Sequence, residues 1–391
     1  MEKVEKAVQA ARAKAQAGSL PEALESLLAL EKTHRLAADV AETKAVVVAI
    51  VRLCHEAGDW KALNEHIVLL AKRRAQIKNA VADMVKECML YVDAASDIAK
   101  KVELIETLNT VTEGKIYVEI ERARLVRQLA RIKEEQGKIK EAAEVLQGCA
   151  VETFGAMHRR EKIAFILEQV RLCLDHKDFM RAQILSKKIN PRTFKRAEKA
   201  AAKEGEKGKK EPEPLNADAV IQEPVEGTPE LEALKVTYYE HMARYHASNN
   251  DYLEMCRCHM AVYDTPSVKA EPLRWKPLLE AATWYVLLAP SGPEQDDLVR
   301  RLHSDKSMDE LAGHKALLKT FITKEIIHWS SLQATHKPQM DAAAAIFGGD
   351  AGAKRLEDLR LRIVEHNLLV VVAYYSKITL QRLPPPPPLP G

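Results

Sequence analysis

The sequence predicts an all-α protein, a right-handed α-solenoid of helical hairpins like those of tetratricopeptide repeats. The first observation is a short turn followed by a large apolar residue, which recurs at Leu20, Trp60, Ile98, Ile139 and Phe179. The intervals are 40, 38, 41 and 40 residues, and a fixed period of this size is typical of stacked helix pairs. A sixth copy, at Tyr252, comes 73 residues after Phe179.

The second observation is a helical hairpin predicted over residues 113–147, with a tight break at Gly137. After the break, one apolar stripe keeps the i, i+3, i+4, i+7 spacing of a helix: Ile139, Ala142, Ala143 and Leu146. The helix before the break is apolar on two sides, with Ile116, Ile120 and Ala123 on one and Val118, Leu125, Leu129 and Ile132 towards another. Such a helix needs neighbours on two sides, so we expect the hairpin to be one unit of a stack.

The charged residues of this first helix have the spacing of solvated intrahelical pairs: Glu119 with Arg122, Glu121 with Arg124, and Arg131 with Glu135. Pairs of this kind contribute roughly 0.2–0.5 kcal/mol each. We therefore expect them to mark the face of the helix that is in contact with water.

Residues 1–194 are predicted to form the N-terminal helical-repeat solenoid. Each apolar turn residue begins one helix of a pair, and Pro21 stands in the first turn, where its missing N–H costs nothing. The partner helices are predicted between these turns, at Val40–His55, Ala80–Val92, Lys115–Gln136 and Arg160–Leu174.

The composition then changes over residues 195–230. Residues 195–210 carry seven Lys or Arg against three Glu, and residues 211–232 carry seven acidic residues and no basic one. Such a segment cannot bury a core, and we expect a disordered, charged insertion that accounts for the long sixth interval. The basic half could serve nuclear import or nucleic-acid binding, but it lacks interleaved aromatic residues, so we favour a solvated insertion.

Helical patterning resumes at Leu231, and residues 231–330 are predicted to add further repeats. Within them, the loop at 289–293 separates a helix ending near Leu288 from helices at 298–303 and 315–329. Residues 334–354 lack a regular pattern and predict a mobile connector. An amphipathic helix is predicted over 356–375, and the prolines at 384–388 predict an extended polyproline arm.

Composition narrows the class of function. The chain has 59 Lys and Arg against 56 Asp and Glu, and this net charge of +3 makes no case for nucleic-acid binding. The six scattered cysteines, without a secretion signal, indicate reduced core thiols in a cytosolic or nuclear protein. The longest apolar runs, Ala45–Val51 and Leu368–Tyr375, are far shorter than the roughly 18–20 residues of a membrane span.

No arrangement of residues predicts catalysis. Residues 205–210 lack the spacing of a phosphate-binding loop, and the histidines form no zinc-hydrolase motif. Cys256, Cys258 and His259 are the best metal candidates, but residues two apart on a helix point about 200° apart. Cys54 and His55 are adjacent in sequence, and the side chains of adjacent helical residues also point in different directions. We therefore expect no catalytic residue, no metal and no cofactor, and hence no enzyme.

Several sequence segments resemble those of a known family, which periodicity alone does not indicate. Residues 111–125, VTEGKIYVEIERARL, and 133–147, KEEQGKIKEAAEVLQ, closely resemble PCI-family subunits of the proteasome regulatory-particle lid. Shorter matches follow in order along the chain: FILEQVRLCL at 165–174, SKKIN at 186–190, AVYDTP at 261–266, VEHN at 364–367 and AYYSKIT at 373–379.

This resemblance implies a non-catalytic scaffold in ubiquitin-dependent protein degradation, located in the cytoplasm and nucleus. The implied partners are other lid subunits, including PCI subunits and the deubiquitinase, and the ATPase ring or core particle, with no nucleic acid and no membrane. It also implies a winged helix after the repeats. Here the pattern is lost after Leu383, so we expect residues 331–383 to be a connector and the start of an incomplete winged helix, followed by the polyproline tail at 384–391. We expect this short end to belong either to a short isoform or to a coding sequence assembled through a wrong splice site.

Two other assignments stay open at this point. The chain could be a scaffold of a related PCI assembly, either the COP9 signalosome or a translation initiation factor. It could also be an RNA-binding helical-repeat protein, which would need a basic concave face. Acidic residues match the basic ones throughout this chain, which favours a scaffold of a PCI assembly over an RNA-binding protein.

Overall fold

The computed structural model describes residues 2–195 and 222–374, and every regular element within these ranges is a helix. The all-α prediction is therefore confirmed. The chain divides into two compact units: unit 1 is Met1–His176 with Pro212–Glu226, and unit 2 is Lys177–Glu211 with Gly227–Gly391. Most of the charged insertion and the proline tail lie outside the described residues.

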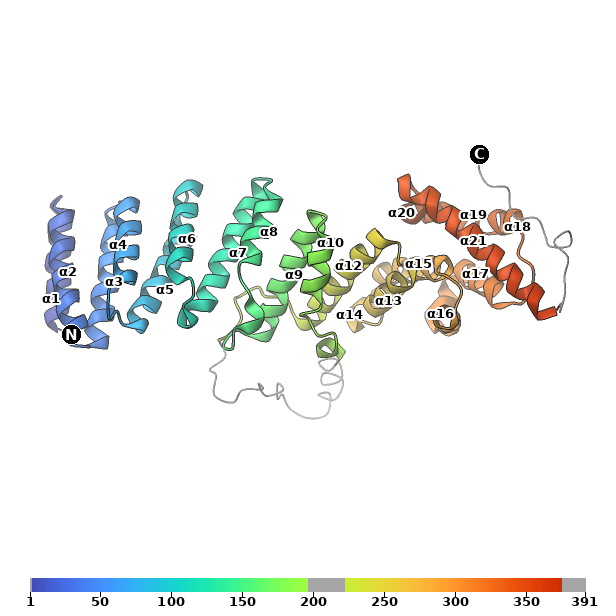
Figure 1. The fold of residues 1–391 in the computed structure, drawn as a ribbon, viewed down its shortest axis with the longest axis horizontal. Coiled ribbons are helices and arrows are strands. Elements are labelled where there is room, and N and C mark those ends of the chain that lie inside the picture. Colours follow the sequence, from blue (N-terminus) through green and yellow to red (C-terminus); the bar gives the residue numbers. More distant parts are fainter. Residues whose placement is uncertain (1, 196–221, 375–391) are drawn as a thin grey trace. The chain divides into compact units, whose positions relative to one another are not determined.

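The helices of unit 1 stand side by side in chain order (Figure 1). Each packs on the next, and alternate helices α1, α3, α5 and α7 also contact one another along the stack. They are α1 (Glu2–Gln16), α2 (Leu20–Leu36), α3 (Val40–Glu56), α4 (Trp60–Lys72), α5 (Lys78–Ala94), α6 (Ile98–Thr112), the 3-10 turn η1 (Ile116–Val118), α7 (Glu119–Glu135), α8 (Ile139–Gln147), the 3-10 turn η2 (Val151–Thr153) and α9 (Arg159–Asp175).

The predicted repeat coincides with the helix boundaries. The six apolar turn residues are the first residues of α2, α4, α6, α8 and, in unit 2, α10 (Phe179–Ser186) and α13 (Tyr252–Tyr263). Aspartate before four of these starts caps the helix, as Asp59 does by accepting a hydrogen bond from the Ala62 N–H at 2.9 Å. Gly58 precedes it with a φ of +71°, a conformation that an L residue adopts only with strain.

Helix α7 has neighbours on both sides, as the apolar pattern predicts. Ile120 and Ala123 are buried, and Leu125 and Leu129 belong to the apolar core that runs from Val4 to Val111. The assignment of Ile116 to a buried face is wrong. This residue is 81% exposed, because the chain before Glu119 forms the 3-10 turn η1 and the helical phase begins only after it.

Unit 2 begins with α10 and continues in helices of more varied length. They are α12 (Leu231–Asn249), α13, α14 (Pro266–Lys269), α15 (Pro272–Leu288), α16 (Pro293–Ser304), the 3-10 helix η3 (Lys306–Glu310), α17 (Ala312–Ile322), α18 (Trp329–Thr335), α19 (Lys337–Ala342), α20 (Ala344–Phe347) and α21 (Gly349–Tyr374). No helix of the described residues combines the length and the apolar character that crossing a bilayer requires.

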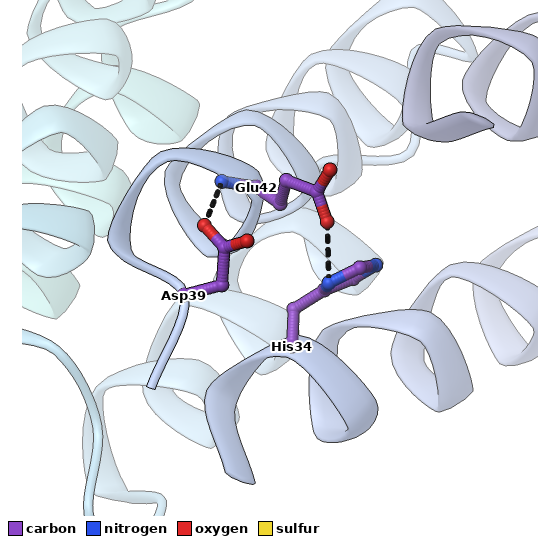
Figure 2. Close-up of side chains that lie close together, drawn as sticks. All are labelled: His34, Asp39 and Glu42. Carbon is purple, nitrogen blue, oxygen red and sulfur yellow. Dashed lines mark hydrogen bonds and ion pairs between the residues drawn. The ribbon is translucent and has the colours of Figure 1, made fainter. Parts of the chain in front are cut away.

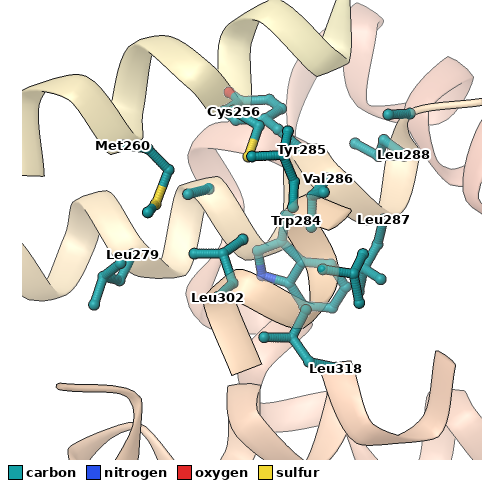
Figure 3. Packing of buried hydrophobic residues seen from close by; sticks show 14 of the residues in the cluster. Cys256, Met260, Leu279, Trp284, Tyr285, Val286, Leu287, Leu288, Leu302 and Leu318 are labelled. Carbon is teal, nitrogen blue, oxygen red and sulfur yellow. The ribbon is translucent and has the colours of Figure 1, made fainter. Parts of the chain in front are cut away.

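The core of unit 2 is centred on α15 (Figure 3). Trp284 is fully buried among leucines of α15, α16 and α17, with the Phe347 ring edge-on at a centroid distance of 4.9 Å. Cys256 and Met260 of α13 pack against the same helix. Helix α15 thus joins the hairpin before it to the helices that follow.

Two expectations for unit 2 need correction. Residues 315–329 do not form one helix: α17 ends at Ile322, and the backbone N–H and C=O of Ile327 bond the Asn367 side chain of α21 at 2.8 and 2.9 Å. The stretch 334–354 is not irregular but forms α19, α20 and the start of α21. Ile346 of α20 is buried and Met340 of α19 packs against the core, and these contacts hold two short helices whose propensity alone would not.

Candidate interaction surface

The cysteine side chains belong to the core. All six are buried and none is in a disulfide, and Cys173 accepts a hydrogen bond from Gln147 Nε2 at 3.3 Å. Burial raises the pKa of Cys54 to about 12, of Cys149 to about 11, and of Cys256 and Cys258 to about 12. Burial also raises the pKa of Cys88 well above its usual range. Because the thiolate is the nucleophile and the metal ligand, these side chains act as small apolar core residues.

The histidines beside two of these cysteines are held by aromatic rings. His55 stacks on Tyr91 with ring centroids 3.9 Å apart, and His259 stacks on Tyr285 at 5.3 Å. Burial lowers the pKa of His259 to about 4, so the ring is neutral at physiological pH. The structure does not bring Cys256, Cys258 and His259 together into a group that could hold an ion.

One group of potential metal ligands is close-set among the described residues: His34, Asp39 and Glu42 (Figure 2). The His34 Nδ1 lies 2.7 Å from a Glu42 carboxylate oxygen, and an Asp39 carboxylate oxygen accepts from the Glu42 N–H at 3.1 Å. These contacts close the turn between α2 and α3 and cap α3, so the side chains already have partners. Sequence reasoning missed this group, because no motif links the three positions.

Salt bridges connect alternate helices of unit 1 into a ladder. Each pair joins residues 35 to 41 positions apart, which is one repeat of the solenoid. The pairs with their shortest N–O distances are Lys44–Asp83 at 2.6 Å, Arg52–Glu87 at 2.8 Å, Lys86–Glu121 at 3.7 Å, Arg124–Glu161 at 2.9 Å and Arg171–Glu134 at 2.5 Å, and Arg127 also pairs with Glu168. The hydrogen bond from Arg171 lowers the pKa of Glu134.

The expectation of solvated intrahelical pairs on α7 is therefore wrong. Glu121 is only 4% exposed and pairs with α5, while Arg124 holds the buried Glu161 of α9. Arg131 likewise turns to Glu168 of α9 rather than to Glu135. The same residues that could bond along one helix bond between helices, because the stack places an opposite charge within reach on the next repeat.

A buried carboxylate joins α2 to the turn between α4 and α5. Glu31 is fully buried and accepts hydrogen bonds from Arg35 Nε at 3.1 Å, from Gln76 Nε2 at 3.0 Å and from Arg73. Arg35 also donates to the Arg74 carbonyl oxygen at 2.6 Å. Two guanidinium groups, those of Arg35 and Arg73, thus share one negative charge.

An open cleft of about 610 Å³ lies on the outer face of α4 and reaches α6. Its lining residues are Asn64, Glu65, Val68, Leu69, Lys72, Arg73 and Thr107. Arg73 connects the cleft to the Glu31 cluster. A polar residue within an apolar stripe is the sequence signal that could have predicted the Glu31 cluster and the cleft. Glu31 follows Leu27 by four residues, and Asn64 lies beside Leu63 and Ile67.

Comparison with known proteins shows a matching family model and several similar proteins. The family model described as PSMD12/CSN4, N-terminal, matches residues 22–204 and 221–271. The chain is 50% identical over 366 residues to the 26S proteasome non-ATPase regulatory subunit 12 homolog A of Arabidopsis thaliana, covering 94% of this chain and 81% of that protein. Homolog B of the same plant is 50% identical over 364 residues, covering 93% and 80%. The 26S proteasome regulatory subunit RPN5 of Saccharomyces cerevisiae is 36% identical over 363 residues, covering 92% and 74%.

Among solved structures, the likeness to BtubC from P. vanneervenii has a TM-score of 0.31 at 16% identity, covering 63% of this chain and 91% of that one, and is too slight to bear on the fold. The stacked helices and their ion-pair ladder define the class of helical-repeat proteins. Within that class, the chain belongs to the family of the 26S proteasome non-ATPase regulatory subunit 12, since the family model matches more than half of it and relatives match nearly all of it.

Proposed function

We propose that the chain is a non-catalytic scaffold subunit of the lid of the proteasome regulatory particle and acts in ubiquitin-dependent protein degradation. The observation that carries this proposal is 50% identity to a 26S proteasome regulatory subunit over 94% of the chain. The same relatives favour the proteasome over the signalosome and the initiation factor.

The interior of the molecule supports a non-catalytic role. The six cysteines are buried, five of them with raised pKa values, and the one close-set group of potential ligands among the described residues is occupied in closing a helical turn. The proposed partners are other lid subunits, the deubiquitinase among them, and the ATPase ring or core particle. The cytoplasm and nucleus are the proposed location.

Affinity purification of the tagged chain, followed by identification of the captured subunits, tests this function. We expect the lid subunits in equal amounts, migrating together with the chain on a native gel. Capture of signalosome or initiation-factor subunits in place of lid subunits would overturn the proposal. A stable monomer with no partner would do the same.

A further inference from the structure

The sequence contains two Thr-Pro dipeptides, Thr228-Pro229 and Thr265-Pro266, and no Ser-Pro dipeptide. Proline-directed Ser/Thr kinases phosphorylate such dipeptides, since proline has no backbone N–H that the kinase would have to satisfy after the acceptor residue. Proline also restricts the residue before it to an extended backbone, which is the conformation in which a kinase cleft holds its substrate. By sequence both threonines are acceptors, and the fold decides between them.

Thr265 is inaccessible in the folded chain. Its exposed fraction is 0%, and its hydroxyl donates a hydrogen bond to the Ala261 carbonyl oxygen at 3.3 Å. The residue lies between the end of α13 and the start of α14, and Val262 and Val268 of these two helices are buried on either side of it in the sequence. A kinase could reach this hydroxyl only if the corner between the two helices unfolded.

Thr228 lies in a stretch without helix, residues 222–230, which leads into α12. The chain turns at residues 226–227, where Gly227 has a φ of +82°, and Thr228 follows the turn directly. Thr228 is partly exposed, and most of the residues around it are fully exposed: Glu223, Val225, Glu226, Gly227, Pro229 and Glu230.

Contacts before the turn hold this stretch in place. The Gln222 N–H donates to the Ala156 carbonyl oxygen at 2.9 Å, and the Glu223 carbonyl oxygen accepts from Arg124 at 3.3 Å. After the turn the chain enters α12. Thr228 can therefore enter a kinase cleft through movement of the turn alone, with α12 left intact.

We propose that Thr228 is a phosphorylation site for a proline-directed Ser/Thr protein kinase. The kinase transfers the γ-phosphoryl group of ATP to Thr228 Oγ1: the new P–O bond forms as the bond to ADP breaks, ADP leaves, and the hydroxyl proton passes to the catalytic aspartate of the kinase. Residues 195–230 contain no Ser, no Tyr and no other Thr, so Thr228 is the one hydroxyl acceptor in this charged part of the sequence.

The modification changes the charge of the chain where it passes from unit 1 to unit 2, since unit 1 ends at Glu226 and unit 2 resumes at Gly227. A phosphate adds about −1.5 to −2 charges at pH 7, and here it would lie in sequence between Glu226 and Glu230. The inference uses only the sequence and burial of the two threonines, so it does not depend on the proposed function.

Phosphorylation of the folded full-length chain tests the assignment. The purified chain is incubated with a mitogen-activated protein kinase and magnesium ATP, and the phosphorylated residues are located by mass spectrometry. We expect phosphate on Thr228 and none on Thr265. The Thr228→Ala variant should reduce incorporation to background, whereas Thr265→Val, which removes the buried hydroxyl and keeps its volume, should leave incorporation unchanged.

Two synthetic peptides, residues 222–233 and 259–270, separate the effect of the sequence from that of the fold. Each carries one Thr-Pro dipeptide outside any tertiary structure, so the kinase should phosphorylate both peptides. In the folded chain it should phosphorylate only Thr228. The contrast between peptide and chain at Thr265 then measures the protection that burial provides.

Three results would overturn the proposal. The first is phosphate on Thr265 of the folded chain at a rate similar to that on Thr228, and the second is a folded chain or a 222–233 peptide that takes up no phosphate at Thr228. The third concerns the cell. The chain purified from its own cells in the presence of phosphatase inhibitors should carry phosphate on Thr228, and its absence there would contradict the assignment.

Discussion

At the scale of single residues, the ionisable groups of the core decide how the protein responds to its solvent. His259 is enclosed between α13 and α15 against the Tyr285 ring, and its burial lowers its pKa to about 4. Burial lowers the pKa of His314, His336 and His366 in the same unit too. These neutral rings favour apolar packing but make unit 2 sensitive to acid.

Unit 2 should lose stability as the pH falls from about 6.5 to about 4. In this range the unfolded chain binds a proton at His259 and the folded chain does not, so protonation favours unfolding. The pKa difference at His259 corresponds to roughly 3 kcal/mol once the pH is below the folded value. Urea unfolding followed by tryptophan fluorescence would measure it, since Trp275, Trp284 and Trp329 lie in unit 2.

The matched variants for this measurement are His259→Phe and His328→Gln. The first keeps a ring against Tyr285 and should reduce the dependence on pH, while the second changes an exposed histidine and should leave it intact. Equal pH profiles for His259→Phe and the unchanged chain would show that another group controls acid unfolding.

The thiols should be inert while the chain is folded. With six buried cysteines and raised pKa values at five of them, Ellman's reagent should react only as the protein opens. In denaturant, all six thiols of the chain should react with the reagent. Without denaturant, the same reaction should be slow. A rapid stoichiometric reaction of one thiol in the native protein would identify an accessible cysteine and contradict the burial seen here.

At the scale of helices, α7 shows how one repeat depends on the next. Its apolar residues enter the core of the preceding hairpins, and its charged residues bond α5 on one side and α9 on the other. A helix with this arrangement derives little of its stability from its own intrahelical pairs.

Leu129→Asp should destabilise unit 1 strongly, because Leu129 is 3% exposed and the carboxylate would have no partner in an apolar core. The milder Leu129→Ala should cost about 2–5 kcal/mol from lost contacts and the cavity left behind. Glu135→Ala, on the exposed side of the same helix, should change stability by less than about 0.5 kcal/mol. Denaturant unfolding of the three variants measures these differences. Equal unfolding midpoints for the Leu129 variants and Glu135→Ala would refute the two-sided packing of α7.

Glu31 tests the link from α2 to the turn before α5. Glu31→Gln removes the charge that Arg35 and Arg73 share and should cost about 3 kcal/mol, since it leaves their guanidinium groups without a counter-ion. Glu25→Gln, on the exposed face of α2, is the control. Melting temperatures compared at low and high salt would show the loss, and an unchanged value for Glu31→Gln would mean that the cluster contributes nothing to stability.

At the scale of the whole molecule, the chain divides into two compact units whose main boundary lies at His176, and the charged insertion follows α10, the first helix of unit 2. The composition of residues 195–230 predicts an exposed charged insertion, and most of it lies outside the described residues. Limited proteolysis should therefore cut there first and yield two helical fragments. First cuts within residues 115–190 would contradict this domain organisation, and size-exclusion chromatography of the nicked protein would show whether the fragments remain associated.

The sequence by itself determined the period of the solenoid, the first residue of six helices and the family. These are local properties, since an apolar residue after a capping aspartate or a glycine turn begins a helix whatever it later contacts. Tertiary structure alone decided which charges pair, because Arg124 and Glu161 are 37 residues apart and meet only when the repeats stack. It also decided that Ile116 is exposed and that Thr265 is buried. Helical periodicity gives the face on which a residue lies, whereas burial and pairing depend on what the neighbouring repeat places opposite that face.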